Sequence, residues 1–210
     1  MTGKKAKEET DSSTEEKIKS AARTIFHKKG FAATRTRDIA EEAGLNLALL
    51  NYYFRSKQKL FDLIMLESMQ QFLTSMTGMF NDRETSLEKK IELLVSNYID
   101  LLTEEPDIPL FILSELRNNP QELVSKIKVK EVLMKSYLMK QLQQAVEEGI
   151  IAPINPLHFI MNIMGLTVFP FIAKPILSHL GDLSDEDFNR LVEQRKALVP
   201  KWVKAIMAVG

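Results

Sequence analysis

The sequence contains no cysteine in its 210 residues. Without cysteine, no disulfide scaffold, thiolate metal site or cysteine nucleophile can form, which fits a reducing cytoplasm. The first residues have no apolar run after their lysines, so no secretory signal is expected and the protein is predicted to be cytoplasmic. A chain of this length forms one larger domain or two small ones, and either can bury a hydrophobic core.

The chain also has no net charge, because its 28 basic residues balance 28 acidic ones. Taken alone, this balance argues against a nucleic-acid partner. The charges are unevenly distributed, however: residues 1–60 hold 13 basic and 8 acidic residues, whereas residues 61–210 hold 15 and 20. A positive first part is the electrostatic footprint expected of a protein that binds phosphates, although composition alone leaves chance scatter as an alternative.

Signatures of catalysis are missing as well. The sequence has no G-x-S-x-G, H-E-x-x-H, G-x-G-x-x-G or G-x-x-x-x-G-K-[ST] motif, and His27, His158 and His179 lack the spacing of metal ligands. We therefore expect neither an enzyme nor a bound metal or cofactor. His158, which lies in an apolar stretch, is interpreted as a hydrogen-bonded core histidine.

No segment alternates between apolar and polar residues for long enough to predict a strand, so the chain is expected to be all-α. Residues 1–13 are polar and are predicted to be a disordered arm. Apolar residues at helical spacing then predict helices over residues 14–29, 57–80, 87–102, 108–116, 121–148, 156–180 and 184–207, with Pro200 kinking the last one.

Residues 34–60 have the pattern of a helix-turn-helix followed by a third helix. Thr34 has a hydroxyl suited to capping the first helix. Gly44 can adopt the left-handed conformation that ends this helix and turns the chain. Asn46 and Ser56 are suited to capping the two helices that follow. Three potential caps within this short range indicate three helix starts.

The order of these residues resembles the DNA-binding domain of the TetR (tetracycline-repressor) family of bacterial regulators. The resemblance covers about the first sixty residues. It rests on Lys29-Gly30-Phe31, Thr34, Asp38-Ile39-Ala40, Ala43-Gly44-Leu45, Leu50, Tyr52-Tyr53-Phe54, Ser56-Lys57 and Leu60. It implies an N-terminal three-helix DNA-binding domain at residues 14–60 and a larger helical effector-binding and dimerisation domain at residues 61–210. In this family the last two long helices form the dimer interface as a four-helix bundle.

Candidate DNA contacts lie on the helix that would enter the major groove and around the helix before it. Leu47 would contact a thymine methyl group or be ordinary surface, and many family members have lysine there. Asn51 would bond to adenine or to a phosphate, and the family usually has tyrosine there. Lys57, at the start of the third helix, is expected to bind phosphate. The full candidate set is Arg35, Thr36, Arg37, Asn46, Leu47, Ala48, Asn51, Tyr52 and Lys57.

The remaining expectations concern the body of the protein. The resemblance implies a small-molecule pocket among the middle helices, with Asn97, Tyr98, Phe111, Tyr137, His158 and Asn162 as candidate lining residues. No charged residue occurs between Ile150 and Ala173, which raises the alternative of a membrane helix. The polar residues and prolines in this stretch favour a helix buried against the body on one side and against a second subunit on the other.

Together these observations predict a homodimeric transcriptional repressor that leaves a near-palindromic operator when a small apolar effector binds. An activator is also compatible with the sequence. A second class is a DNA-bound structural or interaction protein of the same fold that binds another protein and no metabolite. A helical enzyme is a third class, which predicts turnover and no operator binding.

Overall fold

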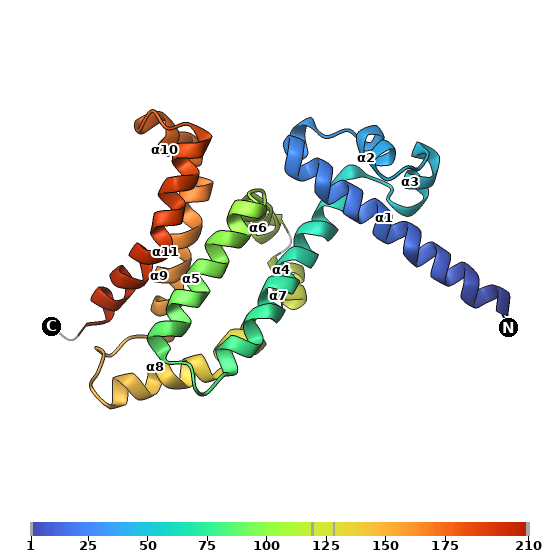
Figure 1. The fold of residues 1–210 in the computed structure, drawn as a ribbon. Coiled ribbons are helices and arrows are strands. Elements are labelled where there is room, and N and C mark those ends of the chain that lie inside the picture. Colours follow the sequence, from blue (N-terminus) through green and yellow to red (C-terminus); the bar gives the residue numbers. More distant parts are fainter. Residues whose placement is uncertain (1, 119, 128, 209–210) are drawn as a thin grey trace. The chain divides into compact units, whose positions relative to one another are not determined.

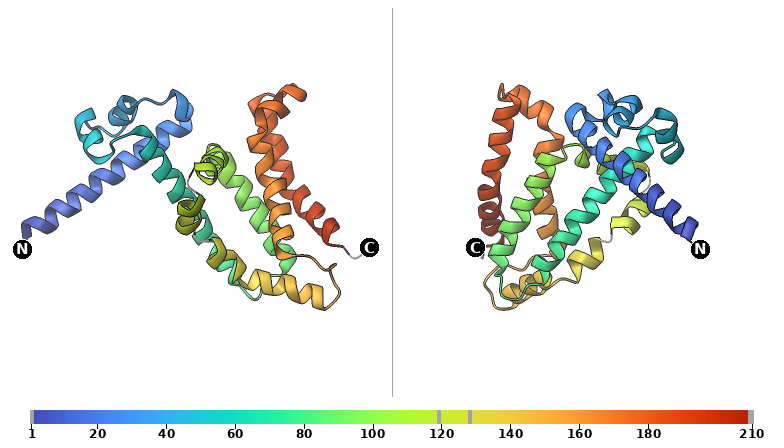
Figure 2. Two further views of the ribbon diagram at one scale, coloured as in Figure 1. Left: turned by 180° about the vertical axis from the view of Figure 1, so that it is seen from behind. Right: turned by 45° about the vertical axis from the view of Figure 1, so that its right-hand side comes forward.

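The computed structural model describes residues 2–118, 120–127 and 129–208, and every regular element in these ranges is a helix (Figures 1 and 2). This confirms the all-α prediction. The elements are α1 (Thr2–Ala33), α2 (Thr36–Glu42), α3 (Leu47–Tyr53), α4 (Lys57–Asn81), α5 (Leu87–Glu104), α6 (Ile108–Asn118), α7 (Pro120–Ile127), the π-helical η1 (Lys130–Met134), α8 (Tyr137–Glu147), α9 (Pro156–Ile172), α10 (Lys174–Leu180) and α11 (Asp185–Met207).

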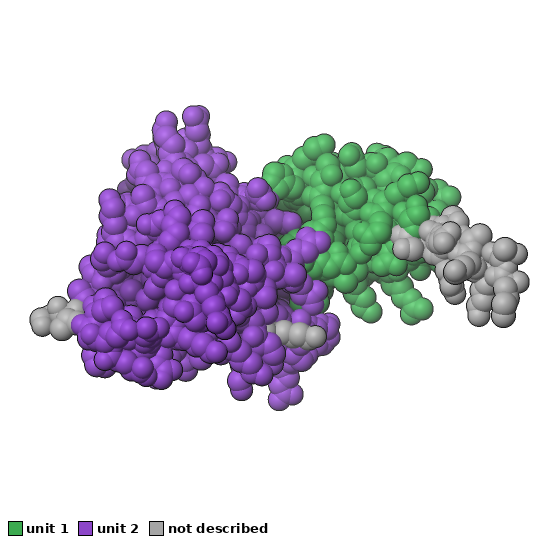
Figure 3. Space-filling view, turned by 60° about the horizontal axis from the view of Figure 1, so that its bottom comes forward, with its two compact units in different colours: residues 1–68 green, residues 69–210 purple. Residues whose placement is uncertain are grey.

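The chain folds into two compact units, residues 1–68 and residues 69–210 (Figure 3). The boundary between them falls inside α4, whereas the sequence placed it at residue 60. In the first unit α2 packs on α1, and α3 packs on α2. Its core is built from side chains at helical spacing, including Ile18, Ala22 and Phe26 of α1 and Leu60 and Ile64 of α4.

The first helix differs from the expectation at its N-terminus. The sequence predicted a disordered arm over residues 1–13, but α1 is helical from Thr2 onward. Residues 4–13 contain neither glycine nor proline, so no residue in this stretch breaks a helix. At its other end α1 is interrupted at Gly30, which has a φ of 70°. Gly30 therefore marks the end of the regular helix, as the sequence predicted.

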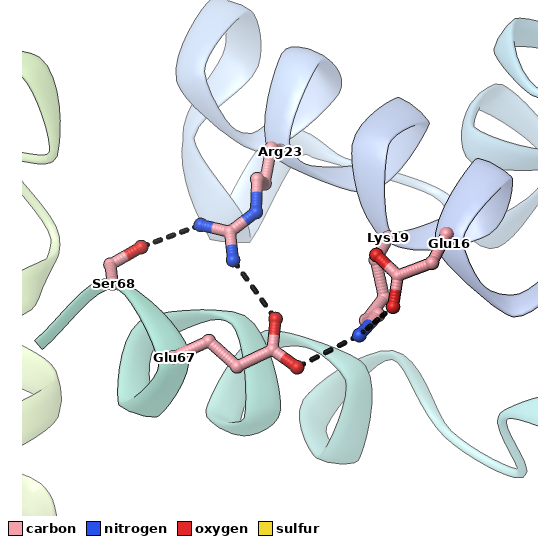
Figure 4. A network of polar contacts seen from close by, with 5 residues as sticks. All are labelled: Glu16, Lys19, Arg23, Glu67 and Ser68. Carbon is pink, nitrogen blue, oxygen red and sulfur yellow. Dashed lines mark hydrogen bonds and ion pairs between the residues drawn. The ribbon is translucent and has the colours of Figure 1, made fainter. Parts of the chain in front are cut away.

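A polar network joins α1 to α4 within the first unit (Figure 4). The Glu67 carboxylate accepts a hydrogen bond from Lys19 Nζ at 2.8 Å and another from Arg23 Nη2 at 3.0 Å. Arg23 Nη1 donates to Ser68 Oγ at 2.6 Å. Lys19 and Ser68 are buried, so water screens these charges less than it would at an open surface. The network fixes the first turns of α4 against α1.

The second unit has its core where α5, α9 and α11 pack against one another, and α8 packs against α5. α5, α9 and α11 lie side by side in both figures (Figures 1 and 2). The core side chains include Phe80, Ile99, Phe159, Phe188 and Val199, all of which are almost completely buried. The helical spacing of the apolar residues thus predicted the buried face of α5. In α11 only part of the apolar series turns inward: Phe188, Val192 and Val199 are buried, whereas Leu191, Trp202 and Ile206 are exposed.

The region predicted as one helix over residues 121–148 is divided into α7, η1 and α8. The chain breaks at the buried Ser136, whose backbone is extended with a ψ of 162°. The Ser136 hydroxyl donates to the Leu133 carbonyl at 2.6 Å, and the Asn81 side chain accepts from the backbone N–H of Tyr137 at 3.2 Å. These side-chain bonds replace helical ones and allow α8 to begin in a new direction.

The apolar stretch that raised the membrane alternative forms two helices. In the part of the chain that the structure describes, no single helix is long and apolar enough to cross a membrane. α9 and α10 reach that length and composition only as a pair, and they are bent by 70° relative to each other.

Candidate nucleic-acid interface

The turn between α2 and α3 has the hydrogen bonds of a Schellman motif. Gly44 has a φ of 67°, in the left-handed region. Its N–H donates to the Glu41 carbonyl at 3.1 Å, and the N–H of Leu45 donates to the Ala40 carbonyl at 2.9 Å. Both bonds satisfy carbonyls that the end of α2 leaves without helical partners. Gly44 therefore ends the first helix of the pair, as predicted.

α3 presents a polar outer face and an apolar inner face. The Asn46 side chain caps it by accepting from the Leu49 N–H at 2.8 Å, as predicted. Leu50 and Phe54 are buried. On the outer face Ala48 and Asn51 are exposed, and Tyr52 keeps 75% of its surface in solvent. Leu47 is half-buried, so it is less available than the sequence suggested.

The start of α2 differs in detail from the expectation. Thr34 does not cap the helix: it is buried, and its hydroxyl donates to the Gly30 carbonyl at 2.7 Å. Arg35 occupies the cap position, and its N–H donates to the Asp38 carboxylate at 3.1 Å. This bond and the ion pair with Lys29 at 3.1 Å hold the pKa of Asp38 below its usual value. The Asp38 carboxylate, and not the Thr34 hydroxyl, is therefore the side-chain group that accepts a hydrogen bond at the start of α2.

The predicted phosphate donors around α2 differ in exposure. Arg35 and Arg37 are exposed, and Thr36 is half-buried. Lys57 is half-buried, and its ammonium turns inward to donate to the carbonyls of Phe31 and Thr34 at 2.7 and 2.8 Å. This inward geometry differs from the outward phosphate contact expected from the sequence. Ser56 caps α4 as predicted, since its hydroxyl accepts from the Lys59 N–H at 3.2 Å.

These features combine a short capped helix with an exposed polar face, a glycine turn and a preceding helix whose start carries two exposed arginines. Residues 18–64 match the model of the family described as bacterial regulatory proteins, tetR family. This part of the chain belongs to the TetR family. The protein is therefore a DNA-binding transcriptional regulator with a helix-turn-helix, and the family is one of regulators, not enzymes.

Several transcriptional regulators can be aligned with nearly the whole chain. The chain is 26% identical to the probable HTH-type transcriptional regulator YttP of Bacillus subtilis (strain 168), over 94% of this chain and 96% of that one. It is 29% identical to the HTH-type transcriptional regulator RutR of Escherichia coli O157:H7, over 97% and 95% of the two chains. The crystal structure of FadR from Bacillus subtilis in complex with stearoyl-CoA has the same fold, with a TM-score of 0.56 and 21% identity over 87% of this chain and 96% of that one.

The six candidate pocket residues of this TetR-family chain lie in different environments. His158 is exposed, so the prediction of a core histidine was wrong: α9 turns this position outward and places Phe159 in the core. Tyr98 is buried and stacks on Phe72 with ring centroids 5.2 Å apart. The remaining four comprise the buried Phe111 and the half-buried Asn97, Tyr137 and Asn162.

The second unit does contain a groove, formed by α5, the end of α8 with the loop after it, and α11. Its volume is about 1010 Å³, at the upper end of the usual range for small-molecule sites. None of the six candidate residues lines it. Its lining combines apolar and charged side chains: Ser86, Leu87, Glu88, Lys89, Ile91, Glu92, Leu93, Ser96, Ala145, Gly149, Ile150, Ile151, Lys196, Ala197, Pro200, Lys201, Lys204, Met207 and Ala208.

Proposed function

We propose that this regulator is a homodimeric repressor that binds a near-palindromic operator through α3 and is released by a small-molecule effector. The observation that supports recognition of the DNA sequence is the exposed outer face of α3. Ala48, Asn51 and Tyr52 are exposed there, while Leu50 and Phe54 hold the helix to its unit. A small alanine permits close approach to base edges, and an asparagine amide can make two hydrogen bonds to adenine.

The arginines at the start of α2 supply the second part of the proposal. Arg35 and Arg37 are exposed within a part of the chain that carries excess positive charge. Contacts to phosphate would fix the register of the protein on the duplex and make its affinity fall with salt, whereas contacts from α3 would select the sequence.

Dimerisation is proposed through α9 and α11, which pack on each other and each leave apolar side chains uncovered. On α9 these are Leu157, Met161 and Met164, and on α11 they are Leu191, Leu198, Trp202 and Ile206. Their spacing puts each set along one side of its helix. Two such faces are suited to a four-helix contact between subunits.

The effector site is proposed to be the groove between α5 and α11. Buried side chains of Ile91, Ile151 and Met207 supply apolar contacts, and lysines and glutamates in the lining supply charges of both signs. FadR, which shares the fold, was crystallised with stearoyl-CoA, which supports the idea that a body of this architecture can hold a small molecule. An effector releases the operator only if it binds the two states of the protein with different affinity.

Selection of bound fragments from random double-stranded DNA tests the proposal. We expect enrichment of two inverted half-sites whose centres are separated by one helical turn, roughly 34–36 Å, or a multiple of it. Retention of no fragment above a scrambled pool would refute DNA reading. A thermal-shift screen of apolar small molecules with the selected fragment present then tests release. If no compound shifts the melting temperature, the alternative of a protein partner is favoured.

A further inference from the structure

Lys57, the first residue of α4, lies against the connection between α1 and α2. Its Nζ donates to the Phe31 carbonyl at 2.7 Å and to the Thr34 carbonyl at 2.8 Å. The same ammonium lies 4.2 Å from the centre of the Phe31 ring, within the range of a cation–π contact. Two of the three N–H groups of this ammonium are therefore used inside the unit.

In a regular helix the carbonyls of Phe31 and Thr34 would accept from the N–H groups four residues further on, but here both of these N–H groups bond to other acceptors. The donor four residues beyond Phe31 is the Arg35 N–H, which bonds to the Asp38 carboxylate. The donor four residues beyond Thr34 is the Asp38 N–H, which bonds to the Arg35 carbonyl at 3.0 Å. A positive side chain at the C-terminal end of α1 is also favourable for the dipole of that helix. Lys57 thus caps α1 from a different helix.

The Phe31 ring connects this cap to the core of the first unit. It contacts the Phe61 ring of α4 at 4.7 Å and the Phe26 ring of α1 at 6.0 Å, measured between ring centroids. Phe26 and Phe61 also contact each other edge to face at 5.2 Å. The chain between Gly30 and Arg35 is therefore held on one side by aromatic packing and on the other by the lysine.

We propose that Lys57 is a positioning residue for DNA binding: it fixes the connection between α1 and α2, and thereby the orientation of Arg35 and Arg37, without itself binding phosphate. This inference rests on the proposed DNA-binding function. It reverses the role expected from the sequence, in which the lysine at the start of α4 takes a phosphate. The two roles predict different salt dependence.

A phosphate ligand and a positioning residue can be separated by the slope of log affinity against log salt concentration. Loss of one phosphate contact lowers the magnitude of this slope by about 0.9. Loss of a positioning residue lowers the affinity at every salt concentration and leaves the slope nearly unchanged if the arginine contacts re-form on binding. It also loosens the backbone in the absence of DNA, which loss of a phosphate contact does not do.

The experiment uses the full-length protein, the selected DNA fragment and the variants Lys57→Met, Lys57→Arg and Lys59→Met. Lys59→Met is the matched control, because Lys59 is exposed on the same helical turn and its N–H is bonded to Ser56. For Lys57→Met we expect affinity to fall roughly tenfold to a hundredfold with little change in slope, given the usual strength of hydrogen bonds to charged groups. Amide exchange at residues 34–39 should accelerate by a similar factor without DNA.

Lys57→Arg should not restore either quantity, because a planar guanidinium cannot reproduce the contacts of a compact ammonium. A slope reduced by about 0.9 with unchanged amide exchange, or full recovery with arginine, would overturn the proposal and restore the phosphate role.

If Lys57→Met does not fold, Phe31→Leu serves as the second variant, because it removes the ring and leaves the charge. Unchanged exchange at residues 34–39 in Phe31→Leu would also count against the proposal. If the wild-type protein binds no DNA, the proposed function fails, while the exchange measurement still decides whether Lys57 holds the connection.

Discussion

The guanidinium of Arg195 bonds to the main-chain carbonyl of Leu166, with Nε at 3.2 Å and Nη2 at 2.7 Å from the oxygen. The helical partner of this carbonyl would be the nitrogen of residue 170, which is proline and carries no hydrogen. α11 therefore supplies to α9 the donors that the proline removes. Arg195 also lies over the Trp202 ring, 5.0 Å from its centre, so its side chain is held on its own helix as well.

Replacing Arg195 by methionine should lower the free energy of unfolding by roughly 1–3 kcal/mol, because the Leu166 carbonyl would lose its partner. The cost should be smaller when Pro170→Ala is also present, since alanine returns an N–H at the right position in α9. Urea unfolding of the wild type, the two single variants and the double variant, at one protein concentration, measures this coupling. Equal costs of Arg195→Met in both backgrounds would show that the arginine does not compensate for the proline.

Lys90 is expected to contribute to stability although its charge is fully buried, with no exposed surface. Its ammonium donates to the carbonyls of Phe80 and Asp82 at the end of α4 and to Gln141 Oε1 of α8 at 2.8 Å. Lys90→Met keeps the volume but leaves these acceptors unpaired, so we expect a loss of roughly 1–3 kcal/mol in chemical unfolding. The exposed neighbour Lys89 is the control, and Lys89→Met should change stability by about 0.5 kcal/mol or less. Similar losses in both variants would contradict a specific role for Lys90.

Tyr98 should make the protein sensitive to alkaline pH. Burial raises the pKa of its hydroxyl from 10.0 to about 12. Because the folded state then holds its proton to higher pH than the unfolded state, the stability contributed is complete below pH 10 and is lost as the pH rises through about 12. The expected loss is roughly 2–3 kcal/mol. It should be absent in Tyr98→Phe, as measured by unfolding at a series of alkaline pH values. Parallel pH profiles of the two proteins would disprove the assignment.

Much of the fold follows from periodicity and local chemistry, both of which can be read without coordinates. Apolar spacing predicted the buried face of α5, and the conformational freedom of Gly44 predicted the turn between α2 and α3. The outward position of Asn51 follows in the same way, because Leu50 and Phe54 fix which side of α3 faces the core.

Contacts between distant residues were the part that sequence patterns could not supply. A lysine at a helix start reads as a phosphate donor, and only the folded chain shows that Lys57 meets the carbonyls of Phe31 and Thr34. The break before α8 depends on Ser136 and on Asn81, which are far apart in sequence. His158 was misplaced because α9 is so rich in apolar residues that its pattern does not distinguish the buried side from the exposed one.

Asn51 is expected to select sequence, and Arg37 is expected to bind without selecting it. Asn51→Ala should reduce discrimination at one base pair by roughly 1–3 kcal/mol, because the amide is the group on α3 suited to bidentate contact with adenine. Arg37→Ala should weaken binding to all sequences alike and reduce the salt slope by about 0.9. Competition assays with single-base variants of the selected fragment measure both effects. Unchanged base preference in Asn51→Ala would show that Asn51 does not select the DNA sequence.

A charge placed in the uncovered apolar faces of α9 and α11 should separate the proposed dimer. Met161 keeps 62% of its surface exposed and Trp202 keeps 38%, and a glutamate at either position would become buried without a partner if the faces meet. We expect Met161→Glu and Trp202→Glu to sediment as folded monomers at concentrations where the wild type is a dimer. Leu113→Glu on α6 is the matched control, because this residue is also apolar and exposed but lies outside the two helices, and it should remain dimeric. The monomers should bind a single half-site about as well as a full operator, since the gain from two linked contacts depends on the dimer. A dimer that survives both substitutions would move the interface to another surface of the second unit.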